Sequence, residues 1–245
     1  MAEIKFPTEE VELPSKGLVY PEDNPLSSGK IEMKYMTAKE EDILTNQNYI
    51  KQGIVIDKLL KSLIVSKINY DDLIVGDKNA ILIAARILGY GKDYEFTYNE
   101  EEVSIDLTEL ETQYLDESLI TKGENEFSFT LPHTKTNITY KLLTNRDDRK
   151  IDAEIKGLKR INKHASFDLS TRLKYMITSV NGETEDKDIR DFVDNHMLAR
   201  DSRALREHIR KTQPDIQMKF TFTGNDGVEE DATVPMTAGF FWPDI

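Results

Sequence analysis

The chain is organised around residues 37–91, TAKEEDILTNQNYIKQGIVIDKLLKSLIVSKINYDDLIVGDKNAILIAARILGYG, the only stretch apolar enough to nucleate a core. Thr37 and Glu40 have the spacing of a capping box, so a helix is expected to begin there. After Gly53 the apolar residues recur at i, i+3, i+4, i+7 and i+8, which places them on one face of a second helix. These residues are Ile56, Leu59, Leu60, Leu63 and Ile64.

A third helix is predicted over residues 78–88, with Asp77 as its cap and Gly89 as the residue that ends it. Its run ILIAARIL is apolar on nearly all sides, so this helix is expected to be buried. Its one charge, Arg86, then needs a carboxylate or carbonyl partner. A salt bridge to a neighbouring helix is favoured over a functional role. The side chains predicted to be fully buried are Leu60, Leu63 and Ile81.

The composition bounds the kinds of partner. The 245 residues have a net charge of −13, and 38% of them are hydrophobic against 31% charged, so a modest core with much solvated or partner-facing surface is expected. An acidic surface repels phosphates, which argues against a nucleic-acid partner. The lack of cysteine excludes disulfides and thiolate metal sites. No signal-peptide pattern or membrane-length apolar run occurs, so no membrane role is expected and a cytoplasmic product fits.

A loop rich in proline and glycine, LPSKGLVYPEDNPLSSG, lies between two predicted half-buried strands near the N-terminus. Its apolar residues Leu18 and Tyr20 should pack it against the rest of the chain. Loops also carry binding residues more often than cores do, so Leu18 and Tyr20 are candidate partner-binding residues as well.

Beyond the helical block the sequence predicts three β-hairpins, whose first strands are EFTY (95–98), EFSFT (126–130) and KFTFT (219–223). Four amphipathic helices are predicted between the second and third hairpins. The first begins near Asn145. The second carries Leu169 to Val180, and the third carries Ile189 to Met197. The fourth runs from a cap at Asp201 or Ser202 to Gln213. Helices and strands in blocks favour an α+β fold, a helical core with flanking antiparallel β-hairpins.

Five regions follow from this pattern, and they are expected to form one or two compact domains. They are an N-terminal hairpin and Pro/Gly loop (1–36), the helical core (37–91), β-hairpins (92–144), a helical region (145–213), and a C-terminal hairpin with an aromatic tail (214–245).

Candidate catalytic groups do not assemble in the sequence. The four histidines lie far apart without ligand spacing, and no phosphate-binding, α/β-hydrolase or zinc-protease motif occurs. Acidic clusters at residues 71–72, 100–102 and 147–148 are predicted to lie in solvated turns. Paired carboxylates can act as general acid and base only in a cleft that shifts their pKa values, so a hydrolase that uses clustered carboxylates is kept as the alternative hypothesis. No catalytic residue, cofactor or metal is predicted.

Two cationic stripes break the acidic background. Each is a set of basic residues on one helical face: Lys156, Lys159, Arg160 and Lys163 in one stripe, and Arg203, Arg206 and Arg210 in the other. A solvated face balanced by carboxylates is one interpretation. Docking to an acidic partner is the other, because the arginine fork suits bidentate carboxylate pairing. The three arginines are therefore candidate partner-binding residues.

The chain ends in an aromatic segment that includes Phe240, Phe241 and Trp242. Such side chains must insert into this fold or into a partner, because exposed they would promote aggregation. Packing beside the hairpins at residues 94–107 and 219–236 is favoured, since a free aromatic tail would endanger solubility. The same three residues are candidate partner anchors under the other interpretation.

Three groups of motifs follow one another along the chain. They are Leu13-Pro14-Ser15-Lys16-Gly17 through Tyr20 with Gly29 and Thr37 to Leu44; Gly76-Asp77 with Arg86 and Tyr90-Gly91; and Asp201 to Arg206 with Phe240 to Pro243. Together they resemble the baseplate hub assembly proteins of T4-type tailed phages. The resemblance implies a non-enzymatic tail morphogenesis protein that binds other baseplate hub or tail proteins, in the host cytoplasm during assembly or in the virion baseplate. It leaves open the oligomeric state, and whether the protein stays in the virion or leaves as a chaperone.

The chain departs from this family in one respect. Some relatives carry a Cys-x-x-Cys pair after the first aromatic strand and another near the C-terminal strand, which would suit a zinc knuckle. Here Thr97 to Glu100 and Thr223 to Asp226 occupy comparable places. The resemblance therefore implies that aromatic packing replaces metal, with the two hairpins side by side. The aromatic residues are Phe96, Tyr98, Phe220 and Phe222.

Overall fold

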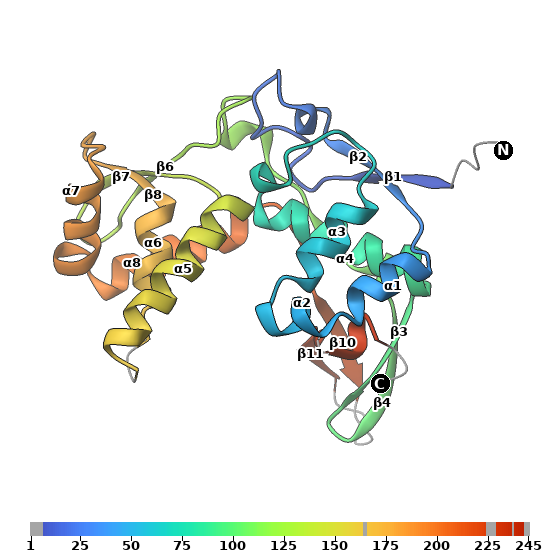
Figure 1. The fold of residues 1–245 in the computed structure, drawn as a ribbon. Helices are drawn as coiled ribbons and strands as arrows, with labels where there is room; N and C mark the ends of the chain where they lie inside the picture. Colours follow the sequence, from blue (N-terminus) through green and yellow to red (C-terminus); the bar gives the residue numbers. More distant parts are fainter. Residues whose placement is uncertain (1–6, 164–165, 224–228, 237, 243–245) are drawn as a thin grey trace.

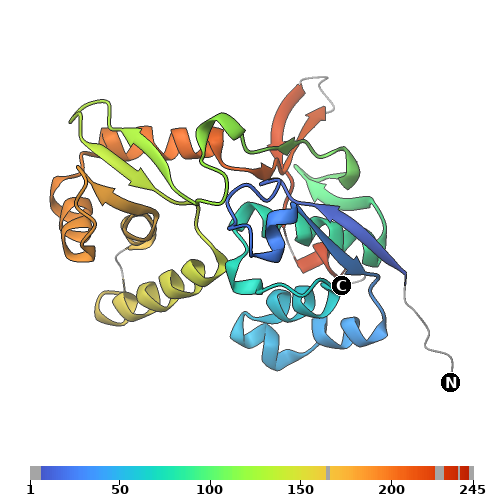
Figure 2. The same cartoon turned by 90° about the horizontal axis from the view of Figure 1, so that it is seen from above.

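The structure is a computed structural model that describes residues 7–163, 166–223, 229–236 and 238–242. It confirms the α+β class, with helices and small antiparallel sheets arranged in two lobes (Figures 1 and 2). The division into one or two domains stays a prediction, because two lobes do not show that either folds alone. Among the described residues, no helix has both the length and the apolar character needed to cross a membrane.

The first lobe holds the N-terminal hairpin and the predicted helical core. The capping box of Thr37 and Glu40 is confirmed, and Leu60, Leu63 and Ile81 have no exposed surface, as predicted. Its elements up to the first aromatic hairpin are β1 (Thr8–Glu12), η1 (Pro25–Ser28), β2 (Lys30–Lys34), α1 (Ala38–Leu44), α2 (Gln47–Gln52), α3 (Val55–Leu63), η2 (Tyr70–Asp72) and α4 (Val75–Tyr90).

The buried carboxylate of Glu40 ties three of these elements together. It accepts hydrogen bonds from Lys34 Nζ at 2.8 Å, Ser62 Oγ at 2.7 Å and Thr37 Oγ1 at 2.5 Å. Burial alone raises the pKa of Glu40, but these hydrogen bonds outweigh it and lower the pKa to about 2. The ionised carboxylate therefore stabilises the packing of β2, α1 and α3.

Helix α4 begins earlier and ends later than the sequence predicts. Asp77 lies in its first turn rather than capping it, and the helix continues through Gly89 to a C-cap at Gly91, where φ is +85°. Gly89 serves close packing instead of termination, because a Cβ there would lie 2.8 Å from the end of the Met36 side chain. The predictions for Asp77 as a cap and Gly89 as the stop were therefore wrong.

Among the described residues, Arg86 makes no salt bridge to a neighbouring helix, contrary to the favoured interpretation. Its guanidinium donates to the carbonyl oxygens of Gly91 at 2.9 Å and Asp93 at 3.2 Å. It also lies 5.3 and 5.8 Å from the ring centres of Tyr90 and Tyr94. The buried charge thus closes the turn that leads from α4 into the first aromatic hairpin.

Two aromatic hairpins pack side by side at the base of the first lobe (Figure 1). The centre of the Phe220 ring lies 5.3 Å from that of Phe96 and 5.5 Å from that of Tyr98. The ring centres of Phe222 and Tyr98 are 5.0 Å apart. The predicted aromatic packing is confirmed. The alternating run TVPM (233–236) predicts the second strand of the last hairpin, but that strand lies earlier in the sequence, at Glu229–Thr233. The strands are β3 (Asp93–Tyr98), β4 (Glu101–Asp106), β10 (Lys219–Thr223) and β11 (Glu229–Thr233).

The second lobe is a three-stranded sheet with helices around it. The predicted helix that runs to Val180 was wrong, because residues 177–180 form a strand beside β7, where Thr139 Oγ1 lies 2.7 Å from Ser179 Oγ. The elements are β6 (Phe127–Thr130), β7 (Asn137–Tyr140), α5 (Asn145–Ile161), α6 (Asp168–Met176), β8 (Ile177–Val180), α7 (Asp186–Asp191), a π-helical turn (Phe192–His196) and α8 (Ala199–Thr212). Short connecting elements are η3 (Leu107–Glu109), β5 (Thr112–Gln113), η4 (Glu117–Leu119), β9 (Asp215–Ile216) and η6 (Ala238–Phe240).

Two predicted helix caps in the second lobe are also replaced. Thr144, not Asn145, caps α5, since its side chain accepts from the backbone N–H of Asp147. Helix α8 begins at Ala199, so Asp201 and Ser202 lie inside its first turn. All three predicted caps, Asn145, Asp201 and Ser202, thus lie inside their helices rather than at the position before the first helical residue.

The aromatic tail packs on its own fold, as favoured from the sequence. Phe240 and Phe241 are only 1% and 3% exposed, and Trp242 is partly buried. The Phe240 ring meets the edge of Tyr94 with 5.0 Å between ring centres, and the Tyr94 hydroxyl donates to the Pro235 carbonyl at 2.9 Å. Pro243 lies outside the described residues.

Replacing Phe240 by alanine should lower the free energy of unfolding by about 3–5 kcal/mol, because it leaves a cavity against Tyr94. Urea denaturation of the full chain measures this change. Met236→Ala is the matched control from the same segment; its side chain is 48% exposed, so the loss should be within about 1 kcal/mol. Equal effects of the two substitutions would contradict the described packing of the tail.

Candidate functional site

The two lobes meet at the start of α4. The backbone N–H of Val75 donates to the Leu143 carbonyl at 3.0 Å, and the N–H of Asn145 donates to the Leu73 carbonyl at 2.8 Å. Arg146 adds an ion pair to Asp72 at 2.8 Å. The segments on either side of the junction therefore run next to each other and fix how the lobes are joined.

A buried carboxylate in the first turn of α4 holds the N-terminal loop at this junction. Asp77 has no exposed surface, and it accepts from the N–H of Ser15 at 2.9 Å, from Ser15 Oγ at 2.7 Å and from the Tyr20 hydroxyl at 2.6 Å. The Tyr20 oxygen accepts in turn from the backbone N–H of Ile74 at 3.1 Å. We call this group the Asp77 clamp.

Burial dominates the titration of the Asp77 clamp. It raises the pKa of Asp77 to about 6, although the hydrogen bonds from Tyr20 and Ser15 oppose the shift. Burial, and next the neighbouring Asp77 charge, also raise the pKa of the Tyr20 hydroxyl well above its ordinary value.

Glycines at three positions let backbone segments meet around the clamp. Gly17 and Gly29 have φ of +76° and +72°, and a Cβ on Gly17 would lie 2.4 Å from the Ser27 carbonyl oxygen. A Cβ on Gly76 would lie 1.8 Å from the Pro214 carbonyl oxygen, so α4 touches the chain that leaves α8. The motif residues thus build one junction from three distant parts of the sequence.

Four of the candidate partner-binding residues lie inside the protein. Leu18 and Tyr20 are 8% and 4% exposed, and Phe240 and Phe241 are buried as described above. Their apolar surface is covered by the same chain in this structure, and their assignment as partner-binding residues stays a prediction. Trp242 lies at the edge of the buried tail with part of its surface exposed.

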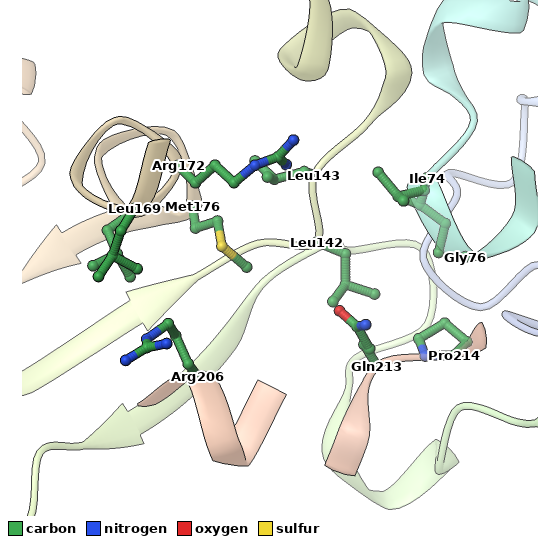
Figure 3. A pocket seen from close by; sticks show the side chains of 12 residues that line it. Ile74, Gly76, Leu142, Leu143, Leu169, Arg172, Met176, Arg206, Gln213 and Pro214 are labelled. Atoms are coloured by element: carbon green, nitrogen blue, oxygen red, sulfur yellow. The ribbon is translucent and has the colours of Figure 1, made fainter. Parts of the chain in front are cut away.

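A cleft with a volume of about 300 Å³ opens between the lobes, beside the junction. Figure 3 shows side chains from α6, α8, the start of α4 and the 142–143 segment converging on it. We call this cavity the interlobe cleft. Its lining residues are Ile74, Val75, Gly76, Leu142, Leu143, Leu169, Arg172, Leu173, Met176, Arg206, Gln213 and Pro214.

The described lining of the interlobe cleft contains two cations and no carboxylate. Arg172 is paired with Asp148 at 3.0 Å, whereas Arg206 forms no ion pair within the part of the chain that the structure describes. Arg203 and Arg210 are exposed on the same helix, three residues before and four after Arg206. The structure thus places one of the three predicted arginines at the rim of the cleft, exposed like the other two.

Helix α8, which carries the three arginines, is held in place by Asp201, a residue that the sequence predicted as a helix cap. Asp201 is fully buried and accepts from the backbone N–H groups of His133 at 2.8 Å and Thr134 at 3.0 Å, in the β6–β7 turn. Burial opposes ionisation, but these hydrogen bonds outweigh it and lower the pKa of Asp201. This contact fixes α8 against the sheet of the second lobe.

The acidic clusters at residues 71–72 and 147–148 form ion pairs, and Asp147 also belongs to a helix cap. Asp71 pairs with Arg149, and Asp147 pairs with Lys141 at 2.9 Å in the first turn of α5, so the 147–148 cluster is not a solvated turn. In the described ranges, no group of three or more histidine or carboxylate side chains could hold a metal ion. His164 lies outside those ranges.

Fold and cleft together define a two-lobed α+β protein whose interlobe cavity is apolar with a cationic rim. Residues 7–242 match the family described as T4 bacteriophage base plate protein, and the chain belongs to that family. It is a phage baseplate protein with a structural or assembly role. A search of curated proteins gave no match, and a search of solved structures also gave none.

Asp77→Ala should destabilise the protein by on the order of 3–5 kcal/mol, because it leaves the buried donors of Ser15 and Tyr20 without an acceptor. Chemical denaturation at neutral pH measures this loss. Asp23→Ala is the matched control, since Asp23 lies exposed in the same loop, and it should change stability by less than about 0.5 kcal/mol. A small effect at Asp77 would show that the clamp does not hold the loop.

Asp77 should also leave a signature in the dependence of stability on pH. Its folded pKa of about 6 exceeds the ordinary value of 3.8, so the folded state binds the proton more tightly than the unfolded state. The stability contributed by Asp77 should therefore fall as pH rises from about 4 to about 6 and stay constant above. The side chain that Asp77→Asn introduces cannot titrate. The free energy of unfolding of the wild type minus that of the variant should therefore fall by roughly 2–3 kcal/mol across that window.

Proposed function

We propose that this protein acts in building the central hub of the phage baseplate, by binding other hub or tail proteins and without catalysing a reaction. The observation that carries the proposal is the match of nearly the whole chain to the baseplate family. The motifs with the hub-assembly resemblance fall inside that match, and several of them form the junction around Asp77. The role is that of a hub component or of a transient assembly chaperone.

The chemistry of the cleft supports a binding role. Its described lining is mainly aliphatic and includes no carboxylate that could act as a general acid or base. The alternative of a hydrolase with clustered carboxylates gains no support there, because the acidic clusters at residues 71–72 and 147–148 are engaged in ion pairs.

Charge and setting shape the proposed partners. With a net charge of −13, the protein is suited to protein partners rather than to nucleic acid. We place its action in the host cytoplasm during tail assembly, followed either by incorporation into the virion baseplate or by release. Self-association is a further partner interaction that the same experiments would detect.

A phage with a nonsense mutation in this gene tests the proposal. Electron microscopy of infected-cell lysates should show incomplete baseplates and no finished tails, and a plasmid-borne copy of the gene should restore both. Complete baseplates in the absence of the protein would contradict an assembly role. Mass spectrometry of purified virions beside the lysate then separates a resident hub component from a chaperone that leaves.

A further inference from the structure

We propose that the interlobe cleft binds an extended segment of another baseplate protein, one that presents a carboxylate beside apolar side chains. The inference rests on the proposed function, because it names the chemistry of the partner in baseplate assembly. The cleft lies where α6, α8 and the start of α4 approach one another, as Figure 3 shows.

The shape and lining of the cleft fit a chain segment. Leu169 and Met176 of α6 line the cleft together with Leu142 and Pro214, and Leu169 keeps 47% of its surface exposed. A volume of about 300 Å³ is at the small end of ligand cavities and accommodates a few side chains, not a folded domain. An extended segment can insert its apolar side chains there while its backbone stays at the mouth.

Charge complementarity selects an acidic segment. Arg206 borders the cleft without an ion-pair partner among the described residues, whereas Arg172 already pairs with Asp148. Arg203 and Arg210 lie exposed on the same helix, where the carboxylate of Glu207 pairs with Lys211 and is also stabilised by both arginines. A guanidinium binds a carboxylate through two parallel hydrogen bonds, which gives the pairing a defined geometry.

The same charge argues against a second copy of this chain as the occupant. Two molecules that each carry −13 repel one another over the distances at which they first meet. A short acidic segment of a partner can reach the arginines without bringing a second complete copy of this acidic chain close to the first.

Contacts within the chain hold the elements that line the cleft in place. Asp201 fixes α8 to the β6–β7 turn, and Gly76 fixes the start of α4 against Pro214. Asn79 Nδ2 also donates to Asp215 Oδ1 at 2.9 Å, just past the end of α8. A preformed site loses little conformational entropy on binding, which favours capture of a flexible segment.

A display library of random peptides about a dozen residues long, panned on the full-length protein, tests the proposal. Enriched peptides should carry Asp or Glu next to Leu, Ile, Phe or Met. A labelled synthetic copy should bind Arg206→Glu at least about tenfold more weakly, about 1.4 kcal/mol, and should also bind Leu169→Ser more weakly. Arg160→Glu is the matched control. It makes the same charge change at an exposed position of α5, outside the cleft lining, and should leave affinity unchanged.

Three outcomes would overturn the inference: no enrichment, enriched peptides without acidic residues, or equal affinity for the wild type and Arg206→Glu. Plasmid complementation of the nonsense phage gives the corresponding test in assembly. If Arg206→Glu restores complete baseplates as well as the wild type does, the cleft is not the docking site, and the assembly role stands. If baseplates form without the protein at all, the proposed function itself fails.

Discussion

The Asp77 carboxylate is the contact on which the rest of the structure depends. It is buried without a cationic partner among the described residues, and three hydrogen bonds from Ser15 and Tyr20 offset part of the cost of that burial. The helix turn that carries it also touches both sides of the second lobe, through Val75 to Leu143 and through Gly76 to Pro214. One helix end therefore organises the N-terminal loop, the lobe junction and a wall of the interlobe cleft.

Features set by neighbouring residues could be predicted from the sequence. The capping box at Thr37, the buried face that includes Leu63, and the aromatic hairpins each follow from spacings of two to four residues. The packing of Phe240 in its own fold was also favoured by the sequence, since an aromatic cluster left exposed until a partner binds would promote aggregation.

Features set by distant residues could not be predicted. Asp77 and Asp201 stand where helix caps are common, but their hydrogen-bond partners lie 62 and 68 residues away, at Ser15 and His133. Residues 177–180 continue a helical pattern, yet pairing with β7 makes them a strand. The cleft depends on the relative placement of two lobes, so the sequence could identify Arg206 as a cation on a helix face but could not show that it borders a cavity.

The motifs that carry the family resemblance are mainly structural. Ser15, Gly17 and Asp77 build the scaffold, whereas Arg206 lies at the surface that this scaffold presents. Native-state hydrogen exchange tests the central claim most directly, because the Ser15 amide donates to a buried carboxylate. The account predicts that the Ser15 amide exchanges only through global unfolding, with the same free energy of opening as the amide of Ile81 inside α4. Exchange of Ser15 at the rate of an open loop, while Ile81 stays protected, would contradict it.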